Sequence, residues 1–242
     1  MRDEKLDLSI IFGLIFLALG SYLYGSICWA IVICRIKNKD DIRSLGDKNP
    51  GAYNTGRSLG TKFGILCMLL DATKGLIPAI LATNIKFGDH QDWAIGLAGS
   101  FTLLGHCYPI FFNFKGGNGY STIFGFMIIY NPCMIIEWGI YVFILTLIFK
   151  YIRPMQFIAI IVTGITSLFI TWPFFWQNLG RLLTIETAMV TLPILILTAA
   201  IIQTPKFIPY FYGIYKGTEE KMFFFRSLFR KKKETTESIL VE

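Results

Sequence analysis

Charged side chains are scarce in this sequence. Asp, Glu, Lys and Arg make up 16% of its 242 residues, and the run from Leu8 to Cys34 contains none of them and no His. Hydrophobic residues make up 54%, which is more than an ordinary soluble domain of this length carries. The run is long enough to cross a hydrocarbon core as a helix, and no small-residue cleavage pattern follows it. We therefore interpret it as a retained first membrane span.

Patterns typical of several other protein classes are also missing. The five cysteines form no C-x-x-C pair, and His106 has no partners at metal-ligand spacing, so neither a disulfide framework nor a metal site is predicted. The glycine-rich stretch at residues 113–122, NFKGGNGYST, lacks the G-K-[ST] ending of a Walker A loop and follows no strand. No Ser-His-Asp arrangement is visible either. We expect no metal and no organic cofactor.

Apolar runs organise the whole chain. They are Leu8–Cys34, Phe63–Ile85, Trp93–Phe112, Gly119–Phe149, Met155–Trp176 and Thr187–Gln203. The fourth run is longer than one untilted crossing requires, and Asn131-Pro132 interrupts it with a break signal. One long crossing there gives six spans in total, whereas two short crossings give seven.

Basic residues decide between six and seven spans. The loop from Arg35 to Lys62 carries seven Lys and Arg residues, and the segment from Lys206 onward carries eight. The positive-inside rule predicts that both are cytoplasmic, which requires an even number of crossings between them. We therefore predict an all-α integral membrane protein with about seven transmembrane helices, its N-terminus outside and its C-terminus cytoplasmic. The net charge of +7 is attributed to this orientation, and no nucleic-acid partner is expected.

This topology gathers the polar stretches on one membrane face. Residues 1–222 are predicted to form a single membrane domain, followed by a basic cytoplasmic tail over residues 223–242. The loop after the first span, the stretch at residues 113–122 and the C-terminal segment all fall on the cytoplasmic side. We expect any functional site at that face.

The stretch from Gly25 to Gly60 has two interpretations. As an anion site, Arg43 and Arg57 would hold phosphate as bidentate donors while Asn49 and Asn54 orient polar groups. As a plain solvated loop, it would contain an Asn-Pro-Gly turn and no ligand. The pattern alone leaves both open. Ser26 lies inside the first span, where a lone serine is usually a helix-packing residue.

The stretch from Gly105 to Thr122 also has two interpretations. Successive N–H groups of Gly116, Gly117 and Gly119 can face one anion, and a helix that starts near Tyr120 would add its positive end. Side-chain donors would be Lys115 and Thr122, with His106 binding phosphate or orienting the loop. The alternative is a flexible loop beside a helix end.

Two acidic residues and one lysine lie within the predicted spans, in addition to His106. Asp71 and Lys74 are three residues apart on one predicted helix, which favours an internal ion pair. Glu137 has no partner that the sequence identifies. Intramembrane charges are costly unless they are paired or functional.

Together these segments resemble the bacterial acyl-phosphate:glycerol-3-phosphate acyltransferases. The shared motifs hold in order and spacing; they are GSI at Gly25–Ile27, DIR at Asp41–Arg43, NPGAYN at Asn49–Asn54, DATKG at Asp71–Gly75, GHCYP at Gly105–Pro109, FKGGNG at Phe114–Gly119 and KGTE at Lys216–Glu219. Arg57 and Gly60 match as well.

The resemblance implies transfer of a fatty acyl group from acyl phosphate to the 1-hydroxyl of glycerol 3-phosphate. The product would be lysophosphatidic acid, made at the cytoplasmic face of the bacterial inner membrane for phospholipid synthesis. The implied catalytic residues are Ser26, Arg43, Asn49 and His106. The implied substrate-binding residues are Asn54, Arg57, Lys115, Gly116, Gly117, Gly119 and Thr122, and Glu219 is a structural residue. Partners are the two substrates and membrane lipid, while the oligomeric state stays open.

Several positions differ from the usual family pattern. Asn118 stands where the glycine loop usually has a lysine, and Asp47-Lys48 replaces the middle of a G-S-G-N motif. We expect Asp47 to repel phosphate and Lys48 to offset it. Arg153 and Gln156 stand where the family usually has two serines after the fifth span. Phe207 and Tyr210 stand where its third motif has a histidine and an asparagine. The alternatives are a divergent paralogue of low activity, or a transporter or lipid-binding protein, although a transporter should show inverted repeats and none is found.

Overall fold

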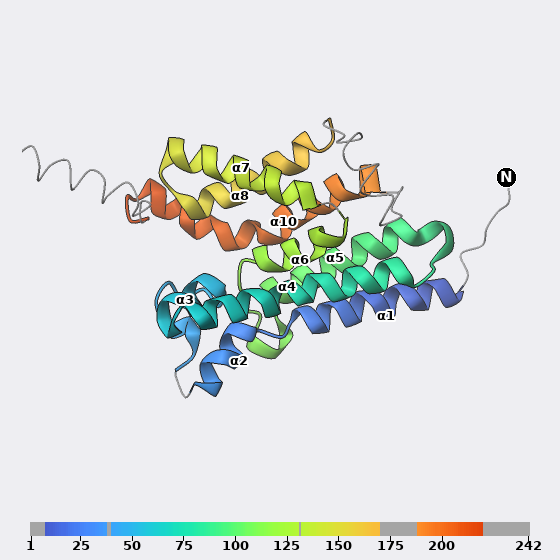
Figure 1. Cartoon of the computed structure of the whole chain (residues 1–242), viewed down its shortest axis with the longest axis horizontal. Helices are drawn as coiled ribbons and strands as arrows, with labels where there is room; N and C mark the ends of the chain where they lie inside the picture. Colours follow the sequence, from blue (N-terminus) through green and yellow to red (C-terminus); the bar gives the residue numbers. More distant parts are fainter. Residues whose placement is uncertain (1–7, 38–39, 131, 170–187, 220–242) are drawn as a thin grey trace, which may run out of the picture.

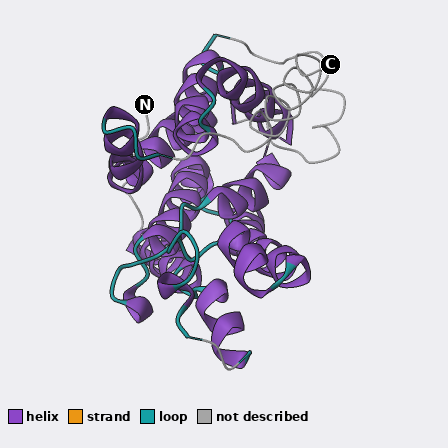
Figure 2. Ribbon diagram, turned by 90° about the vertical axis from the view of Figure 1, so that its left-hand side faces the viewer, coloured by secondary structure: helices purple, strands orange, loops and turns teal. Residues whose placement is uncertain are grey.

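The described residues of the computed structural model are 8–37, 40–130, 132–169 and 188–219, and these form helices joined by short loops (Figures 1 and 2). Four helical segments among them are long and apolar enough to cross a membrane: Leu8–Ile36, Thr61–Asn84, Trp93–Phe112 and Pro132–Phe149. Two shorter helices, Tyr120–Tyr130 and Ile152–Thr166, are also apolar. The all-α prediction is confirmed for this part of the chain.

The first apolar run is two helices. Helix α1 spans Leu8–Gly25, and α2 spans Trp29–Ile36 after a short break. Helix α5, Gln91–Cys107, packs along α1. A Cβ atom at Gly25 would collide with the carbonyl of Thr102, and one at Gly105 would collide with the carbonyl of Tyr22. The two glycines therefore let the backbones touch, as small residues do between membrane helices.

A second close crossing joins α4 to α6. Helix α4 spans Thr61–Asn84 and α6 spans Tyr120–Tyr130. A Cβ atom at Gly75 would collide with the carbonyl of Thr122, and one at Gly125 would collide with the carbonyl of Ala72. This crossing brings the start of α6 against the middle of α4, where Asp71 and Lys74 lie.

The predicted break in the fourth run is confirmed. Helix α6 ends at Tyr130 and α7, Pro132–Phe149, begins with the proline that lacks a backbone N–H. Helix α8, Ile152–Thr166, packs between α7 and α10, Ala188–Tyr215. These three helices lie together on one side of the molecule, with α1, α4 and α5 on the other (Figure 1).

One end of the molecule carries most of the loops. The chain after α2 forms a short 3-10 turn, Ile42–Ser44, and then α3, Ala52–Leu59, which packs on the start of α4. A second turn, Ile110–Phe112, follows α5. Both turns lie at the same end as the last turns of α10 (Figure 1).

Helix α10 differs from the predicted last span. The apolar run was expected to end at Gln203, but the helix continues through Pro205 and Pro209 to Tyr215. Lys206 therefore belongs to a helix rather than to a tail. The end of the fifth run at Trp176 and the tail over residues 223–242 lie outside the described residues.

Candidate active site

A polar cavity of about 630 Å³ lies where the two loops meet α10. The loop after α2 contributes Asp41, Arg43, Ser44, Asp47, Lys48, Asn49 and Pro50. The loop after α5 contributes Asn113, Lys115, Gly116 and Asn118, and α10 contributes Lys206 and Tyr210. The two stretches predicted to converge do converge, and they enclose this cavity.

Arg43 is anchored before any ligand arrives. Its Nε lies 3.0 and 3.1 Å from the two carboxylate oxygens of Asp41, and its Nη2 donates to Oδ2 at 2.6 Å. Its Nη1 donates to the carbonyl of Phe112 at 2.9 Å, which ties the two loops together. Each terminal nitrogen keeps one further N–H with no partner in the described chain. The side-chain hydrogen bond from Arg43 lowers the pKa of Asp41, and the same bond raises the pKa of Arg43.

Asp47 is paired with a residue from a distant helix. Arg153, at the start of α8, donates from Nη2 to Asp47 Oδ2 at 2.6 Å. The other carboxylate oxygen accepts the backbone N–H of Asn49 at 3.0 Å. Lys48 was expected to offset the charge of Asp47, but the ion pair observed here is made by Arg153. The acid and the base are both departures from the family pattern, and they compensate each other.

Asn54 shapes the loop instead of facing the cavity. It is fully buried, and its Nδ2 donates to the carbonyls of Ile42 at 3.2 Å and Leu45 at 2.9 Å. Its Oδ1 accepts the N–H of Asp47 at 3.2 Å. Because its amide is used in this way, Asn54 does not line the cavity. The prediction that it contacts substrate is replaced by a role in holding residues 42–47.

The glycine loop is packed more tightly than an open anion cradle. The N–H of Gly116 donates to the carbonyl of Cys107 at 3.2 Å, so the prediction that it faces an anion is corrected. The amides of Gly117 and Gly119 donate to no atom in the described ranges. A Cβ atom at Gly117 would lie 2.6 Å from His106 Nε2, and Gly119 has a φ of +90°. Glycine is required in this loop mainly because the loop packs directly against the end of α5, where a side chain would collide with His106.

Two cavity residues on α10 were not among the predicted site residues. Lys206 Nζ donates to the carbonyl of Gly116 at 2.9 Å and lies 5.0 Å from the ring centroid of Tyr108. Tyr210 lies one turn further along α10. The spacing of Gln203, Lys206 and Tyr210 places them on one helix face, and that periodicity is the signal in the sequence that could have found them.

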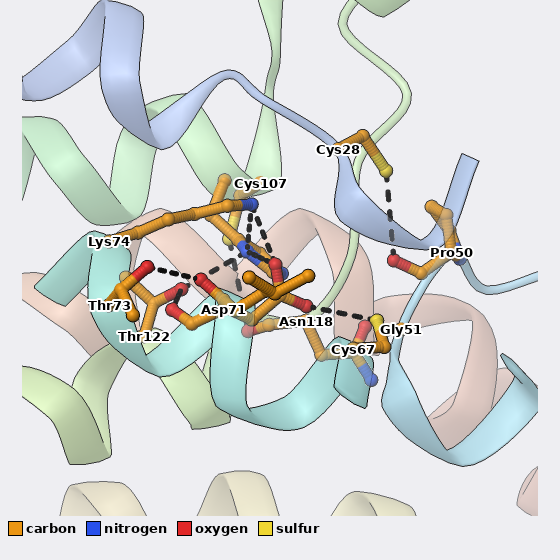
Figure 3. Close-up of polar contacts among 12 residues, drawn as sticks. Cys28, Pro50, Gly51, Cys67, Asp71, Thr73, Lys74, Cys107, Asn118 and Thr122 are labelled. Carbon is orange, nitrogen blue, oxygen red and sulfur yellow. Dashed lines mark hydrogen bonds and ion pairs between the residues drawn. The ribbon is translucent and has the colours of Figure 1, made fainter. Parts of the chain in front are cut away.

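A buried polar network lies behind the cavity. Lys74 Nζ is 2.7 Å from Asp71 Oδ1, which confirms the predicted ion pair (Figure 3). Lys74 also lies 3.3 Å from His106 Nδ1, and the hydroxyl of Thr122 donates to the carbonyl of Asp71 at 3.1 Å. Nδ1 of His106 also lies 3.1 Å from the Thr122 hydroxyl, so this ring nitrogen contacts both α4 and α6.

The remaining predicted residues lie away from the cavity wall. Ser26 is buried, and its Oγ donates to the carbonyl of Tyr22 at 2.8 Å, the bond of a helix-packing serine. Thr122 is buried in the network above. Arg57 is exposed, with its guanidinium 5.7 Å from the ring of Tyr53. The N–H of Glu219 donates to the carbonyl of Gly213 just beyond α10, which suits a structural residue.

Glu137, for which no partner was predicted, accepts hydrogen bonds from two side chains. Tyr141 donates to its Oε1 at 3.1 Å, and Thr166 on α8 donates to the same oxygen at 2.5 Å. The bond from Thr166 joins α7 to α8. No group of three or more metal-ligating side chains occurs within the described ranges.

Comparison with known proteins identifies the family of the chain. Residues 15–206 match the family model described as glycerol-3-phosphate acyltransferase. Among curated relatives of that name, the one from Aquifex aeolicus (strain VF5) is 42% identical over 118 residues, covering 49% of this chain and 60% of the relative. The Legionella pneumophila relative (strain Philadelphia 1) is 42% identical over 48% of this chain and 41% of its own length. The match thus spans about half the length of these two relatives.

Other comparisons cover more of the chain. The Pseudomonas paraeruginosa (strain DSM 24068 / PA7) relative is 33% identical over 177 residues, covering 72% of this chain and 88% of the relative. The crystal structure of PlsY (YgiH), an integral membrane glycerol 3-phosphate acyltransferase, in its glycerol 3-phosphate form, is similar with a TM-score of 0.69 and 27% identity. The similarity covers 90% of this chain and 99% of that structure. The lysophosphatidic acid form of PlsY gives a TM-score of 0.67 and 26% identity over 87% of this chain and 95% of that one. The chain belongs to the glycerol-3-phosphate acyltransferase family.

Proposed function

We propose that this protein transfers a fatty acyl group from acyl phosphate to the 1-hydroxyl of glycerol 3-phosphate, forming lysophosphatidic acid. The observation that carries the proposal is the 630 Å³ cavity, whose wall holds Arg43 and three lysines. Both substrates carry phosphate, and a basic cavity at the end of apolar helices suits a polar head group joined to an acyl chain. The two similar PlsY structures are described as the glycerol 3-phosphate form and the lysophosphatidic acid form, which are the acceptor and the product of this reaction.

The chemical step needs positioning more than an activated side chain. The 1-hydroxyl oxygen attacks the acyl carbonyl carbon, a new ester C–O bond forms, and the bond from that carbon to the phosphate oxygen breaks. The hydroxyl proton leaves with the released phosphate, because both carboxylates of the cavity wall, Asp41 and Asp47, are held by arginines. An acyl phosphate is already an activated donor, so no covalent enzyme intermediate is required.

The residues of the proposed site form two groups: those that line the cavity and those that hold the lining residues in place. Lys48, Lys115 and Lys206 supply positive charge to the phosphates, while Arg43 offers its two remaining N–H groups and Asn49 a polar contact. Gly117 and Gly119 contribute their backbone amides, with Gly116 as part of the wall. Ser26, His106, Asn54 and Thr122 act from behind the wall, and Arg57 contributes charge at the surface of α3.

The enzymatic test uses purified protein in lipid with acyl phosphate and glycerol 3-phosphate. We expect lysophosphatidic acid and inorganic phosphate in equal amounts, without added metal or cofactor. Acyl-CoA should not replace the donor. Sustained product from acyl-CoA with none from acyl phosphate would overturn the proposal, and binding of glycerol 3-phosphate without turnover would favour a divergent paralogue.

We further propose the full topology: seven spans, N-terminus outside and C-terminus cytoplasmic, in the bacterial inner membrane with the cavity facing the cytoplasm. The unit is one membrane domain over residues 1–222 with a basic tail over residues 223–242. Support comes from the separation of α6 and α7 at Pro132 and from the positive-inside rule.

Cysteine accessibility tests this topology. Both sites are exposed in the structure, so Lys86→Cys should react with an impermeant maleimide added to intact cells, and Lys115→Cys should react only after the membrane is opened. The half-buried Cys133 is replaced by Ala in both proteins to lower background. Reaction of Lys115→Cys in intact cells would refute the orientation.

A further inference from the structure

The pair formed by Asp47 and Arg153 joins segments that are 106 residues apart in the sequence. Its Nη2–Oδ2 distance is 2.6 Å, and the side chains of Arg153 and Asp47 are 22% and 10% exposed. Asp47 lines the cavity, whereas Arg153 approaches from behind and does not. An acidic side chain on a wall that must receive phosphate needs an explanation.

The position of the Asp47 carboxylate is fixed from several directions. Oδ1 accepts the N–H of Asn49, and the backbone N–H of Asp47 donates to the buried Asn54. These bonds leave Asp47 little freedom to turn away from the cavity. Its charge therefore stays at the wall and must be neutralised there.

The charges of the wall show what neutralises it. Four basic side chains line the cavity beside two acidic ones. Arg43 and Asp41 cancel within the wall through their three side-chain contacts. Without Arg153, the negative charge of Asp47 would offset the positive charge of one of the three lysines. With Arg153 present, the charges of Lys48, Lys115 and Lys206 are all available to attract an incoming phosphate.

Arg153 also contacts the part of the wall that α10 forms. Its guanidinium carbon lies 5.4 Å from the ring centroid of Tyr210, which lines the cavity from α10. A guanidinium stacks on an aromatic face and binds a carboxylate at once, which a lysine does less well. One side chain on α8 thus connects the loop after α2 to α10.

We propose that Arg153 is a positioning residue that sets the positive charge of the cavity by neutralising Asp47, and so determines the affinity for the phosphate group of glycerol 3-phosphate. The proposal rests on the proposed function for the identity of the ligand. It assigns to Arg153 an effect on substrate affinity rather than on the chemical step, because Arg153 does not line the cavity.

The test compares Arg153→Gln, Arg153→Lys, Asp47→Asn and the double variant Asp47→Asn/Arg153→Gln. Arg153→Gln should raise the KM for glycerol 3-phosphate roughly tenfold at low salt, with kcat within about twofold of wild type. The rise should shrink at high ionic strength, because salt screens partly exposed charges. Arg153→Lys should restore most of the affinity, and Lys86→Gln controls for loss of a basic residue elsewhere.

The double variant separates charge from scaffolding. Asparagine at position 47 still accepts the N–H of Asn49 but carries no charge, so Asp47→Asn alone should keep or lower the KM. The double variant should return to within about threefold of wild type. A double variant as impaired as Arg153→Gln, an unchanged KM in Arg153→Gln, or a raised KM in Asp47→Asn would overturn the proposal.

Direct binding keeps this test independent of turnover. Isothermal titration of glycerol 3-phosphate into each purified protein should give dissociation constants in the same order as the KM values. If the wild type binds the ligand but forms no product, the proposed function fails while the order of the dissociation constants still tests Arg153. If Arg153→Gln does not fold, Asp47→Asn and Arg153→Lys decide the outcome.

Discussion

Loss of the Lys74 ammonium should destabilise the protein strongly. Lys74 and Asp71 are 1% and 3% exposed, and their charges are 2.7 Å apart. Replacing lysine by methionine keeps most of the stem but leaves the Asp71 carboxylate buried, beside the Cys67 thiol at 3.5 Å and His106 Nδ1 at 3.7 Å (Figure 3). Removing one partner of a buried ion pair costs about 3–5 kcal/mol. For a chain of this size that corresponds to a fall in Tm of roughly 6–20 °C.

Thermal unfolding in detergent measures this effect. Lys74→Met should unfold well below wild type, while the exposed Lys86→Met should unfold with it. The double variant Asp71→Leu/Lys74→Met removes both charges and should recover much of the loss, because an apolar pair of similar volume often replaces a buried ion pair without cost. Equal Tm values for Lys74→Met and wild type would refute the assignment of this pair as a buried, mutually dependent unit.

Three further predictions concern the loops. Asn118→Lys should lower the KM for glycerol 3-phosphate by about one to two orders of magnitude in initial-rate assays, because a charge-assisted hydrogen bond contributes roughly 1.5–3 kcal/mol; an unchanged KM would place position 118 away from the phosphate. Gly117→Val should abolish activity, because its Cβ would lie 2.6 Å from a ring nitrogen of His106, whereas Gly96→Ala, with nothing within 4 Å, should keep it. Asp41→Asn should unfold at lower temperature than wild type at neutral pH. The pKa of Asp41 is lowered in the folded protein, so its contribution is complete above the ordinary value of about 3.8 and is lost as pH falls through the folded value. A Tm difference between wild type and Asp41→Asn that does not shrink in acid would contradict this.

Local features of the fold followed from the sequence alone. Apolar runs identified the helices, because uninterrupted hydrophobic stretches of that length are stable only as helices in a membrane or core. The proline at position 132 divided the fourth run, since it cannot donate the hydrogen bond that a continuous helix needs. The ion pair of Asp71 and Lys74 was also predictable, because residues three apart on a helix are neighbours.

Which hydrogen-bond donors of the loops remain free for a ligand could be decided only from the tertiary structure. Whether a glycine amide is free depends on which carbonyl lies beside it, and Cys107 takes the amide of Gly116. In the same way, Asn54 is buried and its side-chain amide donates to the carbonyl of Leu45, so this amide is not free to bind a substrate. A motif names residues that occur together, but it does not say which of their donors remain open.

The composition of the cavity wall also came from tertiary packing. Lys206 bonds to Gly116 across 90 residues, and Arg153 bonds to Asp47 across 106. Helical periodicity determines which side chains share a face, but not which helices meet or in what register. The sequence by itself therefore determined the helices, the family motifs and the local ion pair. The packing of α8 and α10 against the two loops decided which charges the cavity presents, because an ion pair between distant segments exists only once those segments are brought together.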